Sequence, residues 1–394
     1  MTLLQSIKRL TRYAAAMGVG IVALTFVPEV YCHPSTNIAS SGLVNVAASA
    51  PLIISGYDFS AYPAADVPPP INATWNTKYN IAAIPNTIPV KLPMNSMEIG
   101  PCPLTNSSCD WGCFNCTQPT DAVACPQHNS WALSYDDGPS PDTPALLALL
   151  AKLNVKATFC VVGSRVLARP EILRQAYDAG HQICAHTWSH RFLTSQTNEQ
   201  IVAEFEWGLQ IIEQVTGARP AYARPPFGDM DDRVRAVLKS MNLTPLLWNR
   251  DTFDWNLGDP NSGFQAGWIT GNFTNWIATA GTTSTGFMSL EHDLYPQSAA
   301  QTLPALQLVY DAKFQIQPAS TCLGTNPYTS VVSVPIPAVG PNTGRKTGSQ
   351  IALPTNRNTG PNSKSAGILG QSPTTASLVA GLSVLASLGL QSIC

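Results

Sequence analysis

The sequence predicts an α/β protein with a parallel sheet, and it favours a closed or nearly closed (β/α) barrel. Strand-like and helix-like segments alternate through residues 125–330, and alternation of this kind implies parallel strands. Polar clusters follow several of the predicted strands, which is where a parallel barrel places its active site. The number of strand–helix units favours a barrel over a doubly wound sheet. The pattern alone does not decide between these two folds.

The predicted elements follow one another in a regular order. The first strand, residues 131–136, is an apolar run that ends in two aspartates and Gly138-Pro139. Later strands are predicted at 157–162, 181–185, 221–223, 245–249 and 286–290. Helices are predicted to begin at Thr143, Pro170 and Thr197, and near Asp229 and Gly263. Thr197 with Gln200 forms a capping box, and Gly217 is the expected end of that helix.

Both ends of the chain have the composition of targeting signals. Three basic residues (Lys8, Arg9 and Arg12) precede an apolar run at 13–27, which indicates a signal peptide over residues 1–32. A transmembrane helix is the alternative, but the run is shorter than the ~20 residues that a span needs. Residues 368–394 have a polar spacer and an apolar tail after small residues, the order typical of a glycosylphosphatidylinositol (GPI) anchor signal that is removed.

Composition indicates a secreted or wall-associated protein. Charged residues make up 12% of the chain and there are 33 prolines. Residues 33–124 form a Pro-rich, Cys-containing segment, without sustained helical or strand periodicity over 33–101. Residues 331–367 have the composition of a Ser/Thr/Pro/Asn-rich linker. The net charge of -2 gives no excess of basic residues of the kind that nucleic-acid-binding proteins use. Five sequons suit a secretory route: Asn72, Asn106, Asn115, Asn242 and Asn272.

The ten cysteines predict disulfides. Five lie between Cys102 and Cys125, including a C-x-x-C at Cys113 and Cys116, which in a cytosolic protein would suggest zinc or redox chemistry. A signal peptide makes disulfides the better interpretation. Because five cysteines cannot all pair with one another, at least one of them must bond to a cysteine outside this segment. Cys322 is the expected partner. Two further cysteines, at 160 and 184, either pair or remain buried thiols.

Adjacent carboxylates end the first predicted strand. Side chains alternate along a strand, so Asp136 and Asp137 need not have the same role. One can bind a metal while the other acts as a general base toward water. A surface Asp-Asp-Gly turn is the alternative for this stretch alone.

Two histidines follow the third predicted strand. His186 and His190 are spaced i, i+4, which can turn both imidazoles toward one point. With one carboxylate they form a frequent site for zinc or a similar divalent ion. Thr187 stands where the common zinc-protease motif has its glutamate, so a general base has to come from elsewhere, and Asp136 can supply it.

Three later clusters add polar groups. Arg224-Pro225-Pro226-Phe227-Gly228 is a rigid turn that can aim a backbone N–H at an oxyanion, while its arginine pairs with a carboxylate. An ordinary loop is the alternative for this motif. Asp254-Trp255 offers a carboxylate beside an aromatic ring, and Leu290-Glu291-His292 places a histidine after the last strand. Asp254 can orient that histidine and raise its pKa.

Taken together, the five ordered clusters resemble the NodB-homology polysaccharide deacetylases (carbohydrate esterase family 4), most closely the fungal chitin deacetylases. The clusters are Ser-Tyr-Asp-Asp-Gly-Pro, His-Thr-Trp-Ser-His, Arg-Pro-Pro-Phe-Gly, Asp-Thr-Phe-Asp-Trp and Leu-Glu-His, and the match covers residues 131–322. The resemblance implies a distorted (β/α) barrel of the NodB-homology type over residues 125–330. Phe227 stands where tyrosine is common, and Ser134-Tyr135 replaces the frequent Thr-Phe.

The resemblance also implies a role for each motif residue. Asp136 corresponds to the general base, held by Arg224, and His292 to the general acid, oriented by Asp254. The metal ligands correspond to Asp137, His186 and His190. The backbone N–H of Phe227 corresponds to the oxyanion donor, and Trp255 and Leu290 to the walls of the acetyl pocket.

The implied activity is metal-dependent deacetylation of chitin to chitosan and acetate, with Zn²⁺ or else Co²⁺ as the ion. We expect a secreted monomer, anchored to the plasma membrane or cell wall through GPI, that binds chitin or its oligomers and no nucleic acid. Two alternatives stay open. One is a deacetylase for xylan or peptidoglycan, and the other is a non-catalytic wall polysaccharide-binding protein.

Overall fold

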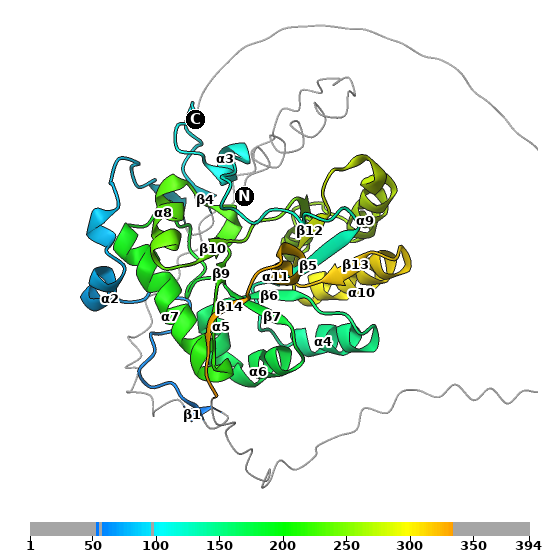
Figure 1. Cartoon of the computed structure of the whole chain (residues 1–394), viewed down its shortest axis with the longest axis horizontal. Helices are drawn as coiled ribbons and strands as arrows, with labels where there is room; N and C mark the ends of the chain where they lie inside the picture. The colour runs from blue at the N-terminus through cyan, green and yellow to red at the C-terminus, as the bar shows by residue number, and fades with distance from the viewer. Residues whose placement is uncertain (1–52, 55–56, 96–97, 334–394) are drawn as a thin grey trace, which may run out of the picture. The chain divides into compact units, whose positions relative to one another are not determined.

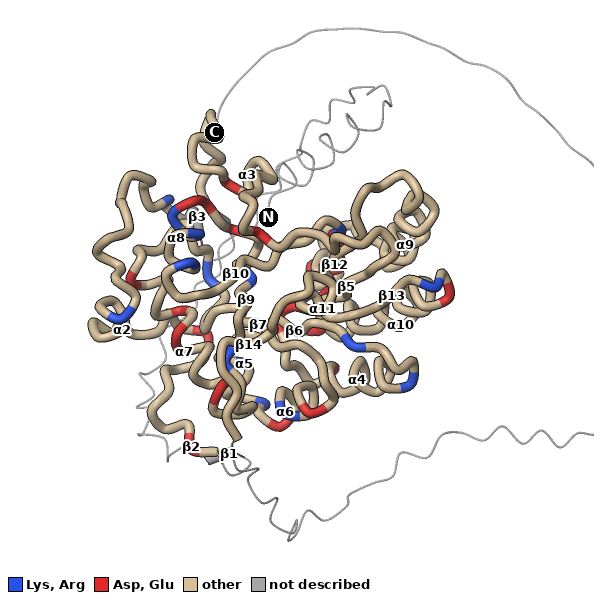
Figure 2. The backbone as a smooth tube through the Cα atoms, viewed as in Figure 1, with Lys and Arg blue, Asp and Glu red and all other residues tan. Residues whose placement is uncertain are grey.

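The computed structural model describes residues 53–54, 57–95 and 98–333. The predicted signal peptide, most of the linker and the anchor signal lie outside this part of the chain. Within it, no helix combines the length and the hydropathy needed to cross a bilayer. Lys and Arg are interspersed with Asp and Glu along the described chain (Figure 2).

The centre of the fold is an eight-stranded sheet in which every pair is parallel. Seven strands follow the order β10 (Thr244–Pro245), β9 (Tyr222–Ala223), β7 (Gln182–Ala185), β6 (Thr158–Val161), β5 (Ser130–Asp136), β12 (Phe287–His292) and β11 (Arg250–Asp251). The eighth, β13 (Gln315–Gln317), pairs with the first half of β5, whereas β6 pairs with its second half. This splitting of one edge of β5 distorts the barrel.

Helices surround the strands (Figure 1). They are α4 (Thr143–Lys152), α5 (Gly163–Ala168), α6 (Pro170–Asp178), α7 (Asn198–Thr216), α8 (Asp232–Ser240), α9 (Gly267–Thr279), α10 (Pro296–Asp311) and α11 (Ala319–Leu323). Short 3-10 turns occur at η2 (Pro226–Gly228), η3 (Asp254–Gly258) and η4 (Ala280–Thr282), and β8 (Ala218–Pro220) pairs with β14 (Tyr328–Val331).

Strand β5 shows how the alternation of side chains builds two layers. Trp131, Leu133 and Tyr135 belong to the large apolar cluster shared with the surrounding helices. Ala132, between them, belongs to a smaller interior cluster. This interior cluster also contains four cysteines and larger residues such as Tyr222 and Met288.

The N-terminal segment has little regular structure, yet it packs on the barrel from Tyr57 onward. It contains α2 (Ala73–Lys78), η1 (Ile81–Ala83), α3 (Trp111–Phe114) and the short strands β1 to β4, at 53–54, 57–58, 93–95 and 98–99. The ring of Tyr62 stacks on Trp188 at a centroid distance of 5.9 Å, and Trp75 meets Trp207 at 5.1 Å. The segment therefore covers the loop that carries the two predicted metal-binding histidines.

Four disulfides join the described cysteines: Cys102–Cys113, Cys109–Cys116, Cys125–Cys322 and Cys160–Cys184. The expected long-range partner, Cys322, does close the barrel region, since its bond spans 197 residues. The C-x-x-C cysteines pair with other cysteines rather than with each other. Four disulfides are typical of a protein from an oxidising, extracellular compartment.

Most predicted elements are confirmed within a few residues, including the capping box at Thr197 and the left-handed Gly217 after α7. The prediction of a strand at 245–249 is wrong in its extent. Only Thr244 and Pro245 pair with β9, and Arg250 and Asp251 pair with β12 at the other end of the sheet. Residues between them cross the gap that would otherwise leave the barrel open.

The long-range disulfide should contribute more stability than the short one in the N-terminal segment. Replacing Cys125 and Cys322 together by Ala should lower the free energy of unfolding by about 2–5 kcal/mol, because the bond restricts a long loop of the unfolded chain. The matched control, Cys102→Ala with Cys113→Ala, opens a loop of 11 residues and should cost less. Urea unfolding followed by tryptophan fluorescence measures both, and an equal or reversed order would contradict the prediction.

Candidate metal centre and active site

The predicted site residues gather at the carboxyl ends of the central strands. Asp136 ends β5, and Asp137 follows it. His186 follows β7, Arg224 follows β9, and His292 ends β12. Parallel strands bring their carboxyl ends to one edge, so residues up to 156 positions apart in the sequence (Asp136 and His292) lie in register.

Asp137, His186 and His190 form a group that could hold a metal ion, with one donor atom from each within 4.8 Å of the others. Asp137 Oδ1 lies 3.5 Å from His186 Nε2 and 3.0 Å from His190 Nε2. One carboxylate and two imidazoles are a donor set suited to zinc and similar ions.

The hydrogen bonding of His186 fits a cation in this position. Its Nδ1 donates to the carbonyl of Arg224 at 2.7 Å, because a carbonyl can only accept. This bond leaves Nε2 facing Asp137 Oδ1, and the lone pairs of these two atoms could both be directed at a bound cation.

Asp137 is presented by an unusual backbone. Its φ is 80°, in the left-handed region, and Arg165 Nη1 donates to its carbonyl at 2.7 Å. Burial opposes ionisation of the Asp137 carboxyl, but the two imidazoles and Arg165 outweigh it and hold the pKa well below its usual range. The ligand is therefore ionised at neutral pH.

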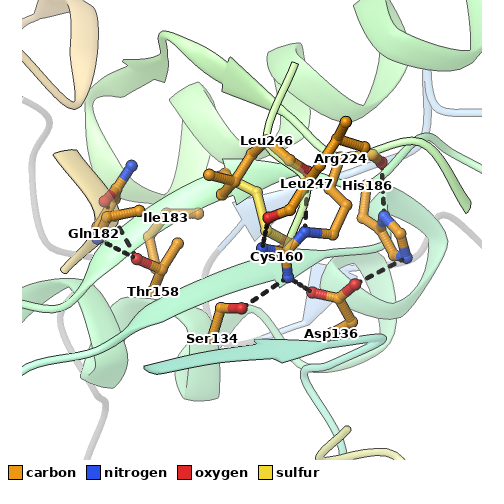
Figure 3. Close-up of a disulfide and its surroundings, with 12 residues drawn as sticks. Ser134, Asp136, Thr158, Cys160, Gln182, Ile183, His186, Arg224, Leu246 and Leu247 are labelled. Carbon is orange, nitrogen blue, oxygen red and sulfur yellow. Dashed lines mark hydrogen bonds and ion pairs between the residues drawn. A yellow bond between two sulfur atoms is a disulfide. The ribbon is translucent and has the colours of Figure 1, made fainter. Parts of the chain in front are cut away.

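Asp136 is held by a fully buried arginine. Arg224 is 0% exposed and Asp136 is 2% exposed. Arg224 Nη1 donates to Asp136 Oδ1 at 2.6 Å and to Ser134 Oγ at 2.8 Å, while its Nε donates to the carbonyl of Leu246 at 3.0 Å (Figure 3). The other oxygen, Asp136 Oδ2, lies 3.7 Å from His186 Nε2, so it is directed at the metal-binding group.

His292 and Asp254 form a second charged pair. Asp254 Oδ1 accepts from His292 Nδ1 at 2.7 Å, and Asp254 Oδ2 accepts from the His292 backbone N–H at 2.8 Å. Burial alone would lower the pKa of His292, but the Asp254 carboxylate outweighs it and raises the pKa to about 10. This imidazole is a cation at neutral pH, with Nε2–H available as a proton donor.

The remaining three predicted pocket residues lie beside these groups. Phe227 is in η2 with a φ of 59°, and its ring contacts His190 at 4.6 Å between centroids. Trp255 follows Asp254 in η3. Leu290, buried in β12, pairs with Ser134 on one side and Asp251 on the other.

The sequon asparagines stand apart from the site. Asn106, Asn115 and Asn242 are exposed, whereas Asn72 and Asn272 are half-buried. Asn72 Oδ1 caps α2 by accepting from Thr74 N at 2.9 Å. Asn272 Nδ2 donates to the carbonyl of Thr252 at 3.4 Å. Their glycosylation stays a prediction.

Two buried carboxyl groups that hold the site were missed in the sequence. Asp293 is 0% exposed; its Oδ2 accepts from Thr143 Oγ1 at 2.5 Å and its carbonyl accepts from Ser140 Oγ. Burial raises the pKa of its carboxyl to about 7. It ties the loop after β5 to the end of β12, and a Cβ at Gly138 would lie 2.6 Å from Asp293 Oδ1, so that position requires glycine.

Glu204 of α7 is the other missed carboxyl group. It is 0% exposed, and its Oε2 accepts from the backbone N–H groups of Trp188 and Ser189 at 3.0 and 2.8 Å. These bonds fix the loop between the two metal-binding histidines. Glu204 lies three residues after Ile201 and seven before Ile211, so it falls on the apolar face of the helix, and this placement was the available signal for it.

The described residues therefore define a class: a (β/α) barrel with an Asp/His/His metal-binding group beside an Asp–Arg pair and a His–Asp pair. Comparison with known proteins gives a family. Residues 124–246 match the polysaccharide deacetylase family. The domain that carries this site is therefore a polysaccharide deacetylase domain of the NodB-homology type.

Two similar proteins are named as chitin deacetylases. The chain is 40% identical to chitin deacetylase 1 of Cryptococcus neoformans over 72% of its own length and 63% of that protein. It is 37% identical to chitin deacetylase 1 of Saccharomyces cerevisiae, over 46% of this chain and 63% of that one. The chain thus spans less than two thirds of these relatives.

A solved structure of the chitin deacetylase from Colletotrichum lindemuthianum is also similar. It has a TM-score of 0.48 and 25% sequence identity, and the match covers 52% of this chain and 92% of that one.

The His292–Asp254 pair should be detectable by titration. In the metal-free protein, Asp254→Asn should lower the pKa of His292 by more than about one unit, because it removes the negative charge that stabilises the imidazolium. Asp259→Asn, in the exposed residue after η3, removes the same charge at a distance from His292 and is the control. Histidine NMR signals followed against pH measure the effect, and an unchanged His292 in Asp254→Asn would contradict the assigned contact.

Proposed function

We propose that this protein hydrolyses the N-acetyl groups of chitin to give chitosan and acetate in a metal-dependent reaction. The observation that carries the proposal is the placement of Asp136, held by buried Arg224, with Oδ2 directed at the Asp137/His186/His190 group. The names of the two fungal relatives support chitin as the substrate.

The general base of the proposed reaction is Asp136. A divalent ion held by Asp137, His186 and His190 would act as a Lewis acid on the amide carbonyl. Asp136 accepts a proton from the attacking water, because its Oδ2 faces the metal-binding group. Arg224 fixes the rotamer of the carboxylate through its bond to Oδ1.

The general acid is His292. As a cation it can donate the Nε2 proton to the leaving amine, and Asp254 holds the ring through Nδ1 and stabilises its charge. Acid and base come from β12 and β5, whose Asp136 and His292 are in register. The two groups thus approach one scissile bond from neighbouring strands.

Three further residues complete the proposed pocket. The backbone N–H of Phe227 donates to the developing oxyanion, and the left-handed backbone at this residue, φ 59°, turns the peptide group of the rigid Pro-Pro-Phe-Gly turn. Trp255 and Leu290 form the apolar walls around the acetyl methyl group. Zn²⁺ is the proposed ion, with Co²⁺ as the alternative, since both suit a site with two imidazoles and one carboxylate.

Secretion and surface attachment belong to the same proposal. The four disulfides and exposed sequons support an extracellular protein. Attachment through a GPI anchor, and a monomeric state, stay predictions; the anchor pattern lies at 368–394, outside the described residues.

Acetate release tests the function and its alternatives together. The purified protein should release acetate from chitin oligomers faster than from acetylxylan or peptidoglycan. Chelation should abolish the release, and Zn²⁺ or Co²⁺ should restore it. Faster release from xylan or peptidoglycan would favour the alternative substrates. Binding to chitin without release from any of the three would favour the non-catalytic wall-binding alternative.

The two adjacent aspartates should behave differently when each is changed to Asn. Asp136→Asn should lower kcat by about 10²- to 10⁴-fold, the usual cost of losing a general base, and keep its metal. Asp137→Asn should lose both metal and activity, because an amide is a poorer ligand than a carboxylate. Metal analysis of the two purified variants distinguishes these roles, and loss of metal from Asp136→Asn instead would reverse them.

A further inference from the structure

A hollow lies at the opposite end of the barrel from the active-site residues. Its volume is about 430 Å³, within the range of about 300–1,000 Å³ usual for small-molecule sites. The residues that bear on its chemistry are Tyr177, His181, Gln182, Ser320, Thr321 and Tyr328. Gln182 begins β7 and His186 follows its end, so the two lie roughly 13 Å apart along the strand direction.

Gln182 belongs to the wall of this hollow, and its side-chain amide is fixed. Gln182 is 3% exposed, and its Oε1 accepts from Ser320 N at 2.8 Å and from Thr158 Oγ1 at 3.1 Å. A backbone N–H can only donate, so the orientation of the amide is fixed. Its Nε2 is buried and has no hydrogen-bond partner among the described residues. A buried donor of this kind is costly unless a ligand or water accepts from it. Figure 3 shows Gln182 and Thr158 far from Asp136 and His186.

His181 supplies a second donor. Its Nδ1 accepts from Ala157 N at 3.2 Å, and burial lowers its pKa to about 4. The ring is neutral at pH 7, and the proton therefore resides on Nε2. His181 and Gln182 line the same hollow as Ser320 and Thr321.

Two tyrosine rings supply the apolar part of the hollow. Tyr177 and Tyr328 are half-buried, and their centroids lie 5.6 Å apart at an interplanar angle of 66°. Tyr328 is held in place because its hydroxyl accepts from Ile183 N at 3.2 Å. Asp178 also lines the hollow, but Arg174 pairs with it at 2.8 Å. Aromatic faces, several hydrogen-bonding groups and little net charge suit a neutral, polyhydroxylated ligand.

We propose that this hollow binds one sugar unit of the polysaccharide, on a chain other than the one being deacetylated. The inference rests on the proposed function. A sugar ring can pack on Tyr177 or Tyr328, and its hydroxyl groups can bond to the exposed hydroxyl group of Thr321. Because the hollow and the active site are at opposite ends of the strands, they engage different chains of an insoluble substrate. The second contact raises the effective concentration of the enzyme at that substrate.

The test compares insoluble and soluble substrates. Tyr177→Ala should lower both binding to insoluble chitin and acetate release from it by about three- to ten-fold, the loss expected for one aromatic contact. Its kcat/KM for soluble chitin oligomers should be unchanged. Tyr310→Ala removes a tyrosine that is 38% exposed on α10, and it should alter neither quantity.

A second variant guards against misfolding of the first. Thr321→Arg fills the hollow from an exposed position of α11 without removing packed atoms, and it should weaken binding to insoluble chitin in the same way. If both variants fold and still bind insoluble chitin as tightly as the wild-type protein does, the inference is overturned. Binding of free N-glycans but not of chitin oligomers in the hollow would also overturn it. Failure of the wild-type protein to release acetate from soluble oligomers would instead overturn the proposed function.

Discussion

The buried ion pair between Arg224 and Asp136 is the interaction on which the rest of the site depends. Two charges away from water are stable only when their hydrogen-bonding groups are satisfied. Arg224 meets this condition through Ser134 Oγ and through the carbonyls of Leu246 and Leu247, at 3.0 and 3.4 Å. The chain that closes the barrel therefore supplies acceptors for the arginine. The segment that closes the barrel thus also fixes the arginine that positions the proposed base.

The same contacts explain which parts of the fold could be predicted from the sequence. Elements with local signals, such as the capping box at Thr197, were predicted correctly. The apolar run at 245–249 is typical of a strand, but Leu246 and Leu247 donate to Ala223 and Ala122 and accept from Arg224, so neither continues a regular ladder. Helix α10 was missed because its first half is polar and Pro304 lies inside it. Strand β13 was missed because Gln315-Ile316-Gln317 is too short for a pattern.

The sequence could indicate which polar residues gather at the carboxyl ends of the strands, for a physical reason. Each proposed ligand or proton-transfer group lies at the end of a strand or in the short turn after it. A few adjacent residues are therefore enough to identify each group in the sequence. Glu204 and Asp293 act on those turns from other elements, through bonds to Trp188, Ser189, Thr143 and Ser140. Such contacts depend on tertiary packing, and single-sequence patterns do not reveal them.

Rigidity beneath the site has a covalent source as well. Cys160 and Cys184 face each other across β6 and β7 in the interior cluster, and Cys125–Cys322 belongs to the same cluster. Strand β6, which carries Cys160, pairs with β5, and β5 ends in Asp136. Strand β7, which carries Cys184, is followed directly by His186. A cross-link between β6 and β7 limits the relative sliding of the strands that position these groups. Because proton transfer and metal binding both depend on distances fixed to a fraction of an ångström, the two disulfides help to keep these groups at the spacing that the site requires.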